Sequence, residues 1–126
     1  MADKILIIDD DPMIIEVMKS RLEANGYEVI SATDGKEGLN RARTDSPGLI
    51  LLDITLPKMD GFRITQLLKL DDRFKKIPIV LFTGRVQEED KETGLAAGAD
   101  AFVPKNFDPE KLLAQLRTLL DKTKGI

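Results

Sequence analysis

The sequence predicts an α/β fold in which helices cover both faces of a parallel β-sheet. Two observations support this. First, five short apolar runs alternate with segments of helical spacing, and each right-handed crossover between parallel strands lays its helix back on the sheet. Second, the three strongest runs are apolar nearly throughout, as strands covered on both faces should be. The length of 126 residues suits one domain with one core.

The predicted strands, in chain order, cover residues 5–8, 29–32, 49–52, 79–82 and 101–103. The first, third and fourth are continuous apolar runs, whereas the second and fifth are weaker. The polar stretch 71–76 is interpreted as a loop that enters the fourth strand through Pro78. Strand and helix therefore alternate five times.

The first helix is predicted from spacing and from signals at both of its ends. Apolar residues recur at helical spacing at Ile14, Met18 and Leu22. Asp11 before Pro12 is typical of an N-cap followed by a first-turn proline. The pair Asn25 and Gly26 predicts the helix end. Asp11 therefore needs no catalytic role.

The last helix carries the same kind of signal. Asp108 before Pro109 predicts an N-cap and a first-turn proline. The apolar positions that follow are Leu112, Leu116, Leu119 and Leu120. Their spacing places them on one face of a helix that packs on the sheet.

Composition excludes several classes of function. The chain has no cysteine and no histidine, so disulfides, thiolate or imidazole metal sites and catalysis by these residues are ruled out. The formal charge of -3 argues against direct binding of nucleic acid, which requires a basic face. No apolar run approaches the roughly 18 residues of a membrane span, and no secretion signal is evident. We therefore expect a soluble cytoplasmic protein without membrane insertion.

Reactive side chains follow four of the five predicted strands. They are Asp9 and Asp10 after the first strand, Asp53 after the third, Thr83 after the fourth and Lys105 shortly after the fifth. In an open parallel sheet the ligand crevice lies beyond the carboxyl ends of the strands. Each residue alone has an ordinary interpretation as a cap, a turn residue or a surface amine. Caps and turns do not require that all of them share this edge.

Three carboxylates at one edge suit a hard divalent cation such as Mg²⁺, which prefers oxygen ligands. Without the cation, repulsion among Asp9, Asp10 and Asp53 should raise some of their pKa values and cost stability. A phosphoryl group arriving at Asp53 would be attacked by one carboxylate oxygen. The cation, the Lys105 amine and the Thr83 hydroxyl would hold its equatorial oxygens, and the product would be an aspartyl phosphate.

Four motifs carry a resemblance to a known family. They are ILIIDDDP (5–12), LLDITLPKMDG (51–61), VLFTG (80–84) and GADAFVPK (98–105). In this order and at these separations they resemble the receiver domain of two-component response regulators, close to the stand-alone chemotaxis type. The resemblance covers essentially the whole chain. It implies a flavodoxin-like (βα)5 doubly wound parallel sheet in strand order 2-1-3-4-5, with the first and third strands side by side.

The resemblance also implies which residues hold the cation. Asp53 would be the phosphoacceptor and a metal ligand. Asp10 would bind the metal directly and Asp9 through water. Thr55 would contribute its backbone carbonyl, so that its side chain is free to vary.

Three further residues receive roles from the resemblance. Thr83 and Lys105 would bind the phosphoryl oxygens. Phe102 matches an aromatic switch position, whose ring would turn inward when Thr83 moves toward the phosphoryl group. A phenylalanine at the edge of the core is the alternative interpretation.

The turn at 56–61 resembles the family's turn after the acceptor strand. Pro57 and Gly61 have backbone roles there, and Asp60 is predicted to cap the third helix. No chemistry is assigned to these residues.

One departure from the family pattern affects the site. The family usually has a cis proline after the active-site lysine, whereas Asn106 follows Lys105 here. Because a cis bond before a residue other than proline costs about 2.5–4 kcal/mol, either this loop is trans and differently shaped or its surroundings hold a strained bond. Two variable positions, Thr55 and Arg85, are associated with phosphoryl lifetime, and we hypothesise that Arg85 slows the access of water.

We expect a signalling switch rather than an enzyme. A histidine kinase or phosphotransfer protein would pass its phosphoryl group to Asp53, with self-catalysed transfer and slow autodephosphorylation. Residues 1–126 are taken as a single receiver domain with no output domain in this chain. Output would then pass through protein contacts on residues 87–97 and 102–120, or lie in a part of the protein outside this chain, and whether the chain is full length stays open. The cognate kinase, the target and phosphorylation-dependent dimerisation stay open.

Two alternatives of other classes remain. A phosphorylation-independent interaction module would keep the fold without using the site, and Asn106 keeps this alternative open. A Mg²⁺-dependent hydrolase with an aspartyl-phosphate intermediate is disfavoured, because such enzymes usually carry a second acid two residues after the nucleophile. This chain has Thr55 at that place.

Overall fold

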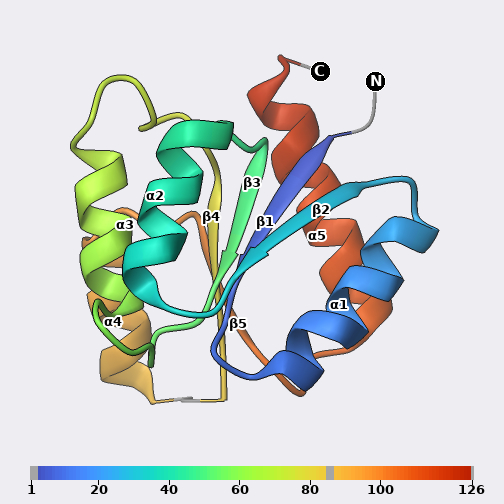
Figure 1. Ribbon diagram of the computed structural model, residues 1–126, viewed down its shortest axis with the longest axis horizontal. Helices are drawn as coiled ribbons and strands as arrows, with labels where there is room; N and C mark the ends of the chain where they lie inside the picture. Colours follow the sequence, from blue (N-terminus) through green and yellow to red (C-terminus); the bar gives the residue numbers. More distant parts are fainter. Residues whose placement is uncertain (1–2, 85–86, 126) are drawn as a thin grey trace.

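The computed structural model describes residues 3–84 and 87–125 (Figure 1). Its five parallel strands form one sheet in the order β2-β1-β3-β4-β5, which confirms the predicted fold class and strand order. The strands are β1 (Lys4–Ile8), β2 (Glu28–Ala32), β3 (Leu49–Leu52), β4 (Ile79–Thr83) and β5 (Ala101–Pro104). β4 and β5 each extend one residue beyond the predicted apolar run, so Thr83 ends β4 rather than following it.

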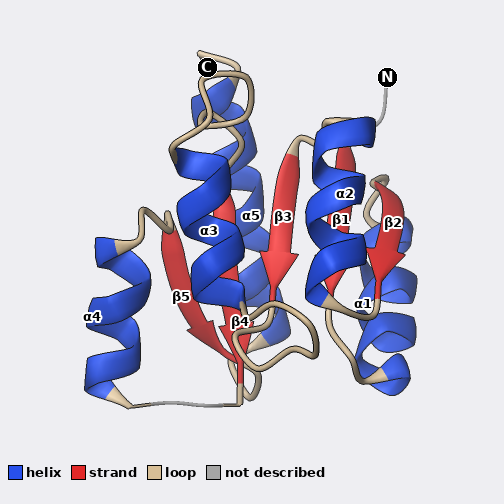
Figure 2. Ribbon diagram, turned by 60° about the vertical axis from the view of Figure 1, so that its left-hand side comes forward, coloured by secondary structure: helices blue, strands red, loops and turns tan. Residues whose placement is uncertain are grey.

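Helices alternate with the strands and cover both faces of the sheet (Figures 1 and 2). On one face lie α1 (Pro12–Ala24) and α5 (Pro109–Thr123). On the other lie α2 (Gly35–Asp45), α3 (Gly61–Lys69) and α4 (Glu88–Ala96). β1 lies between β2 and β3, with Ile8 in register with Ala32 on one side and Leu52 on the other. The residues after β1 and β3 therefore emerge side by side.

The predicted helix ends are confirmed. The Asp11 carboxylate accepts a hydrogen bond from the Met13 N–H at 2.9 Å, and Asn25 is the C-cap of α1, followed by Gly26, whose φ is +89°. That positive φ suits glycine, because a Cβ would strain a left-handed backbone. At α5, the Asp108 carboxylate accepts from the Glu110 N–H at 2.9 Å. The stretch 71–76 is a loop, as predicted.

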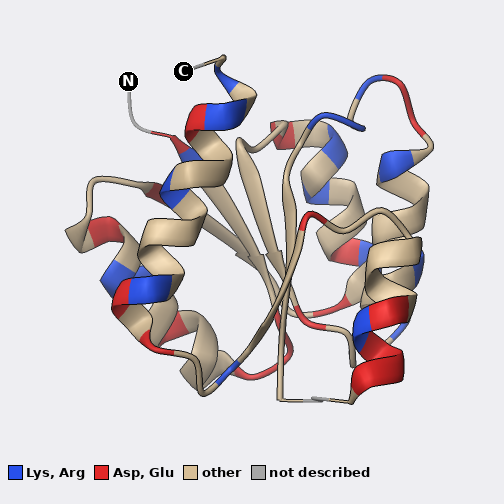
Figure 3. Ribbon diagram, turned by 180° about the vertical axis from the view of Figure 1, so that it is seen from behind, with Lys and Arg blue, Asp and Glu red and all other residues tan. Residues whose placement is uncertain are grey.

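Charged residues lie mainly on helices and loops, whereas the strands are nearly free of them (Figure 3). β3 and β4 carry no charged residue at all, and every residue of both strands is buried. A strand with helices on both faces has no solvent side on which a charge could stay hydrated. Charged residues are therefore placed on the helices and in the loops, where the chain reaches solvent.

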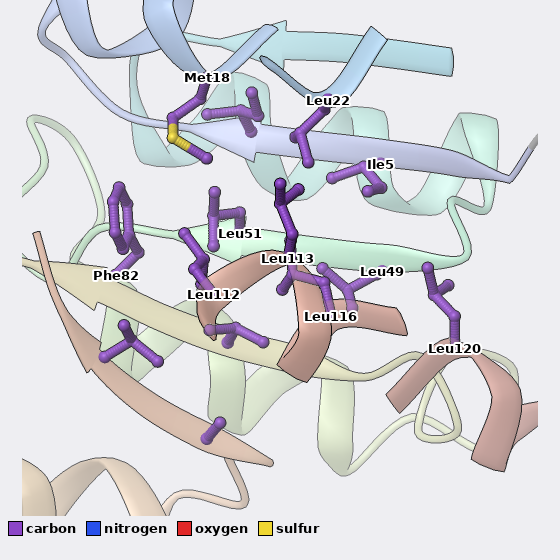
Figure 4. Close-up of a cluster of buried hydrophobic side chains, with 14 residues drawn as sticks. Ile5, Met18, Leu22, Leu49, Leu51, Phe82, Leu112, Leu113, Leu116 and Leu120 are labelled. Atoms are coloured by element: carbon purple, nitrogen blue, oxygen red, sulfur yellow. The ribbon is translucent and has the colours of Figure 1, made fainter. Parts of the chain in front are cut away.

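Two apolar clusters hold the helices on the sheet. Figure 4 shows the cluster under α1 and α5, in which Met18 and Leu22 of α1 and Leu116 of α5 pack on residues of the strands. A second cluster on the opposite face contains Leu39 of α2 and Leu68 of α3, together with strand residues that point the other way. Alternate residues of one strand thus enter different clusters, as the two-residue period of a strand requires.

No helix within the described ranges is long and apolar enough to cross a membrane.

Candidate functional site

The backbone brings two acidic residues together at the carboxyl ends of β1 and β3. The Asp9 N–H donates to the carbonyl of Ala32 at 3.1 Å, and the Asp53 N–H donates to the carbonyl of Ile8 at 2.9 Å. The strand pairing thus continues one step beyond the strands. This fixes both acids against each other before any side chain is considered.

The predicted carboxylates form one cluster. Asp9, Asp10 and Asp53 each offer an oxygen, and these oxygens lie within 4.8 Å of one another. Asp9 is 2% exposed and Asp53 is 7% exposed, whereas Asp10 faces solvent. Three oxygen donors with one open side match the needs of a hard divalent cation that keeps some of its water ligands. The donor set therefore fits Mg²⁺.

Lys105 reaches the cluster from the end of β5. Its Nζ lies 2.8 Å from Asp9 Oδ2 and 3.0 Å from Asp53 Oδ2. Its backbone N–H donates to the carbonyl of Thr83 at 2.8 Å, which ties the lysine to the end of β4. Burial by itself would lower the pKa of the Lys105 amine, but the hydrogen bonds and charges of Asp9 and Asp53 outweigh it, so the pKa is raised above 10.5. Lys105 is therefore a fixed cation next to the proposed acceptor.

Asp9 is held at an energetic cost. Burial raises the pKa of its carboxyl above the ordinary 3.8, and the charge of Asp53 adds to this, while hydrogen bonds from Lys105 and from the Asp11 N–H oppose it. A carboxyl whose folded-state pKa is raised contributes stability below its ordinary pKa and loses it as the pH rises through the raised value. At neutral pH without a cation, ionised Asp9 therefore opposes folding.

The peptide bond between Lys105 and Asn106, in the loop after β5, is trans. No peptide bond between described residues is cis, and this includes the bond from Lys105 to Asn106. Of the two arrangements considered from the sequence, the loop thus adopts the trans one. Lys105 still reaches both carboxylates, so the missing proline does not remove the lysine from the site.

The remaining predicted residues take different positions around the cluster. Thr83 is buried at the end of β4, and Thr55 is exposed in the loop between β3 and α3. Phe102 is half-buried on β5 and lines a shallow cavity of about 220 Å³ with Gln87 and Lys91 of the α4 side. The hypothesis on Arg85 falls outside the described residues.

The turn after β3 has the backbone role expected from the sequence. The Asp60 carboxylate accepts from the Arg63 N–H at 3.0 Å and caps α3. The Gly61 N–H donates to the carbonyl of Ile54 at 2.8 Å, and a Cβ on Gly61 would overlap the carbonyl oxygen of Asp53. Glycine is required because the backbone of α3 begins directly against the backbone of Asp53.

A second contact of this loop was not predicted from the sequence. The first turn of α2, at Asp34 and Gly35, bonds to Pro57 and Lys58. Asp34 followed by Glu37 is an N-cap pattern that could have marked the helix start. Nothing in the local pattern indicates that this turn meets a loop more than twenty residues later.

The chain is similar in sequence to proteins of one known family. A sequence profile of the family described as "Response regulator receiver domain" matches residues 5–117. The chain is 45% identical over 123 residues to the DNA-binding dual master transcriptional regulator RpaA of Synechocystis, covering 98% of this chain and 51% of that protein. It is 38% identical to the alkaline phosphatase synthesis transcriptional regulatory protein PhoP of Bacillus subtilis, covering 98% and 50%. The chain thus spans about half the length of the curated relatives it matches.

Solved structures give the same result. The CheY-like response regulator receiver domain protein of Methanospirillum hungatei superposes with a TM-score of 0.92 at 33% identity, covering 99% of this chain and 98% of that chain. The similarity therefore extends over all five strands and helices.

Proposed function

The chain belongs to the receiver domain family of response regulators, and we propose that it is a phosphorylation switch with Asp53 as the acceptor. Members of this family accept a phosphoryl group from histidine kinases. One observation carries the proposal for this chain. Lys105 Nζ lies within 3.0 Å of carboxylate oxygens of both Asp9 and Asp53, at the shared end of β1, β3 and β5.

We propose that Mg²⁺ binds at the acidic cluster. Asp10 and Asp53 would be direct ligands, Asp9 would bind through water, and Thr55 would provide its carbonyl oxygen. When bound, the cation supplies positive charge that neutralises the carboxylates and polarises the phosphoryl oxygens. The raised pKa of Asp9 supports this, because a cation would remove the cost of its ionised form.

The residues of this chain divide the transfer step between them. One Asp53 carboxylate oxygen attacks the phosphorus, the new O–P bond forms, and the P–N bond to the donor imidazole breaks with its electron pair going to the nitrogen. The Lys105 ammonium, already beside Asp53, holds one phosphoryl oxygen, and the Thr83 hydroxyl holds another. The product is an aspartyl phosphate, and its slow hydrolysis would reset the switch.

We further propose that residues 1–126 act as one receiver domain whose output passes through protein contacts. The proposed surface covers residues 87–97 and 102–120, on α4, β5 and α5. Phosphorylation would shift the population toward a state in which Phe102 turns inward, which requires only differential stabilisation of that state. A cytoplasmic location remains a prediction from the sequence.

The alternative of a phosphorylation-independent module gains no support from the trans loop. Asn106 kept this alternative open because the usual proline after the lysine is missing, whereas Lys105 still contacts both acids. The hydrolase alternative likewise has no supporting observation among the described residues.

The test is the intact mass after incubation with acetyl phosphate, with and without Mg²⁺. The parent is expected to gain one phosphoryl group only when Mg²⁺ is present, and Asp53→Asn is expected to gain none. Asp11→Asn is the matched control, because Asp11 is a neighbouring acid whose carboxylate caps α1. It should be phosphorylated like the parent.

Two results would overturn the proposal. One is a parent protein that stays folded yet gains no mass under these conditions. The other is an Asp53→Asn variant that gains the same mass as the parent, since the acceptor would then be another residue.

A further inference from the structure

The loop between β3 and α3 is attached to the first turn of α2 (Figure 2). The Gly35 N–H donates to the carbonyl of Pro57 at 3.0 Å, and Lys58 Nζ lies 3.4 Å from Asp34 Oδ2. We call these two contacts, made by Asp34, Gly35, Pro57 and Lys58, the α2 clasp. The loop that it holds contains Thr55, whose carbonyl is proposed as a cation ligand.

The start of a helix is suited to holding a loop. The first N–H groups of a helix have no partner within the helix, so they seek an acceptor elsewhere. Asp34 satisfies one of them, because its Oδ1 accepts from the Glu37 N–H at 2.8 Å. The Gly35 N–H is another, and its acceptor is the loop carbonyl of Pro57. The first turn of α2 is therefore held by two acceptors, the Asp34 side chain and the loop carbonyl of Pro57.

The approach of the two backbones is too close for a side chain. A Cβ on Gly35 would overlap the carbonyl oxygen of Met59, and Gly35 is buried. On the loop side, Lys58 has a φ of +70°, in the left-handed region that residues other than glycine rarely adopt. Contact with α2 holds the loop in this turn.

The residues on both sides of Thr55 in the chain are held by hydrogen bonds. Toward α3, the Gly61 N–H donates to the carbonyl of Ile54 at 2.8 Å. Toward α2, the clasp fixes Pro57 and Lys58. Thr55 itself is exposed, whereas Ile54 before it is buried in the core and Leu56 after it packs against the core. The hydrogen bonds around Thr55 therefore act together with this packing to place its carbonyl.

We propose that Asp34 and Gly35 are positioning residues for the cation site, acting through the loop that carries Thr55. This inference rests on the proposed function. Neither residue touches the cation or the phosphoryl group. Their role is to hold a carbonyl ligand in place, so that its release weakens cation binding in addition to any loss of stability from the α2 cap.

The expected effect of substitution is a loss of Mg²⁺ affinity. Removal of a group that orients a metal ligand typically weakens metal binding by about tenfold or more. We expect about that loss for Asp34→Ala in calorimetric titration of the intact chain with MgCl₂. Asp34→Asn should lose less, because asparagine also caps helices through its side-chain oxygen. Both variants remove the same charge, so their difference isolates the cap.

A variant of Lys58, the ion-pair partner of Asp34, distinguishes an effect of loop position on Mg²⁺ affinity from a direct effect of charge. Lys58→Asn removes a positive charge, which by electrostatics alone would tighten Mg²⁺ binding. Loss of the ion pair from the clasp predicts the opposite, a weaker binding of Mg²⁺. The weakening should be only a few fold, because an exposed ion pair contributes little and the bond from Gly35 to Pro57 remains. Asparagine tolerates positive φ, so the turn itself is kept.

Asp108→Ala is the matched control. It removes a cap of the same type at α5, which covers the opposite face of the sheet from α2, so it should destabilise the protein without releasing the loop that carries Thr55 and without a comparable loss of Mg²⁺ affinity. The inference is overturned if Asp34→Ala binds Mg²⁺ like the parent, or if Lys58→Asn binds it more tightly. A folded parent that binds no Mg²⁺ refutes the proposed cation site and the inference with it, whereas a parent that binds beside unaffected variants refutes the inference alone.

Discussion

The two helices that precede and follow β5 along the chain, α4 and α5, are held in very different ways. α5 is fixed by four buried leucines, namely Leu112, Leu113, Leu116 and Leu120. The buried residues of α4 are Asp90 and Gly94, and its large apolar residue Leu95 is 48% exposed. Because each buried leucine contributes about 1.5–3 kcal/mol, α5 has several kcal/mol of apolar attachment that α4 lacks.

The N-terminus of α5 is also more strongly held than the N-terminus of α4. Asp108 caps α5 through its side chain, whereas the N-cap of α4, Gln87, makes no side-chain cap bond. The first turn of α4 is instead acidic, with Glu88, Glu89 and Asp90, and is visible as the red turn in Figure 3. Negative charge favours a helix N-terminus by only about 0.3–1 kcal/mol at an exposed site.

This difference indicates which part of the proposed output surface can respond. Switching elements come from the less stable parts of a protein, where displacement costs little. α4 follows β4, which ends at Thr83, and it borders the cavity lined by Phe102. α4 is therefore the element that the proposed switch can move, with α5 as the fixed support.

The largest expected effect separates the two helices by burial. Leu116→Ala should lower the free energy of unfolding by about 2–5 kcal/mol, because Leu116 is fully buried and a cavity remains. Leu95→Ala is the matched substitution on α4 and should change it by less than about 0.5 kcal/mol. Urea unfolding of both variants measures this. Equal losses would contradict the assignment of α5 as the fixed helix.

Hydrogen exchange should show the same contrast without any substitution. Amides in the middle of α4 are expected to exchange at least about tenfold faster than those in the middle of α5, since α4 can open without exposing the core. Mass spectrometry of peptides from the two helices gives the rates. If amides in α4 exchange only through global unfolding of the protein, α4 is not less stable than α5 and the contrast is wrong.

Removal of the α5 cap should have a smaller effect. Asp108→Ala is expected to lower the free energy of unfolding by about 0.5–2 kcal/mol, because the Glu110 N–H loses its acceptor. Asp108→Ser keeps a capping oxygen and should recover most of this loss. If serine and alanine behave alike, the cap bond is not the source of the stability.

The smallest expected effect is a gain in α4. Gln87 has extended backbone angles, φ -117° and ψ 149°, which suit an N-cap. Gln87→Ser should therefore add a cap bond and slow exchange in α4 by a few fold, equivalent to about 0.5–1 kcal/mol. Exchange in α5 serves as the internal control and should not change. No slowing in α4 would show that the cap does not limit its opening.

The sequence by itself determined the elements and the contents of the site. Strand runs, helical spacing and the pairs of Asp11 with Pro12 and of Asp108 with Pro109 act over a few residues, so they can be recognised locally. Because the strands are parallel, their carboxyl ends then lie at one edge of the sheet. For this reason Asp9, Asp10 and Asp53 could be predicted to meet.

Only the tertiary structure decided how these residues are held. The raised pKa of Asp9 depends on burial under neighbouring elements, and the trans loop at Asn106 could be settled only in place. The contact of Gly35 with Pro57 joins segments more than twenty residues apart. Such contacts depend on the distances at which packed elements come to rest, and the spacing of residues along the chain does not encode those distances.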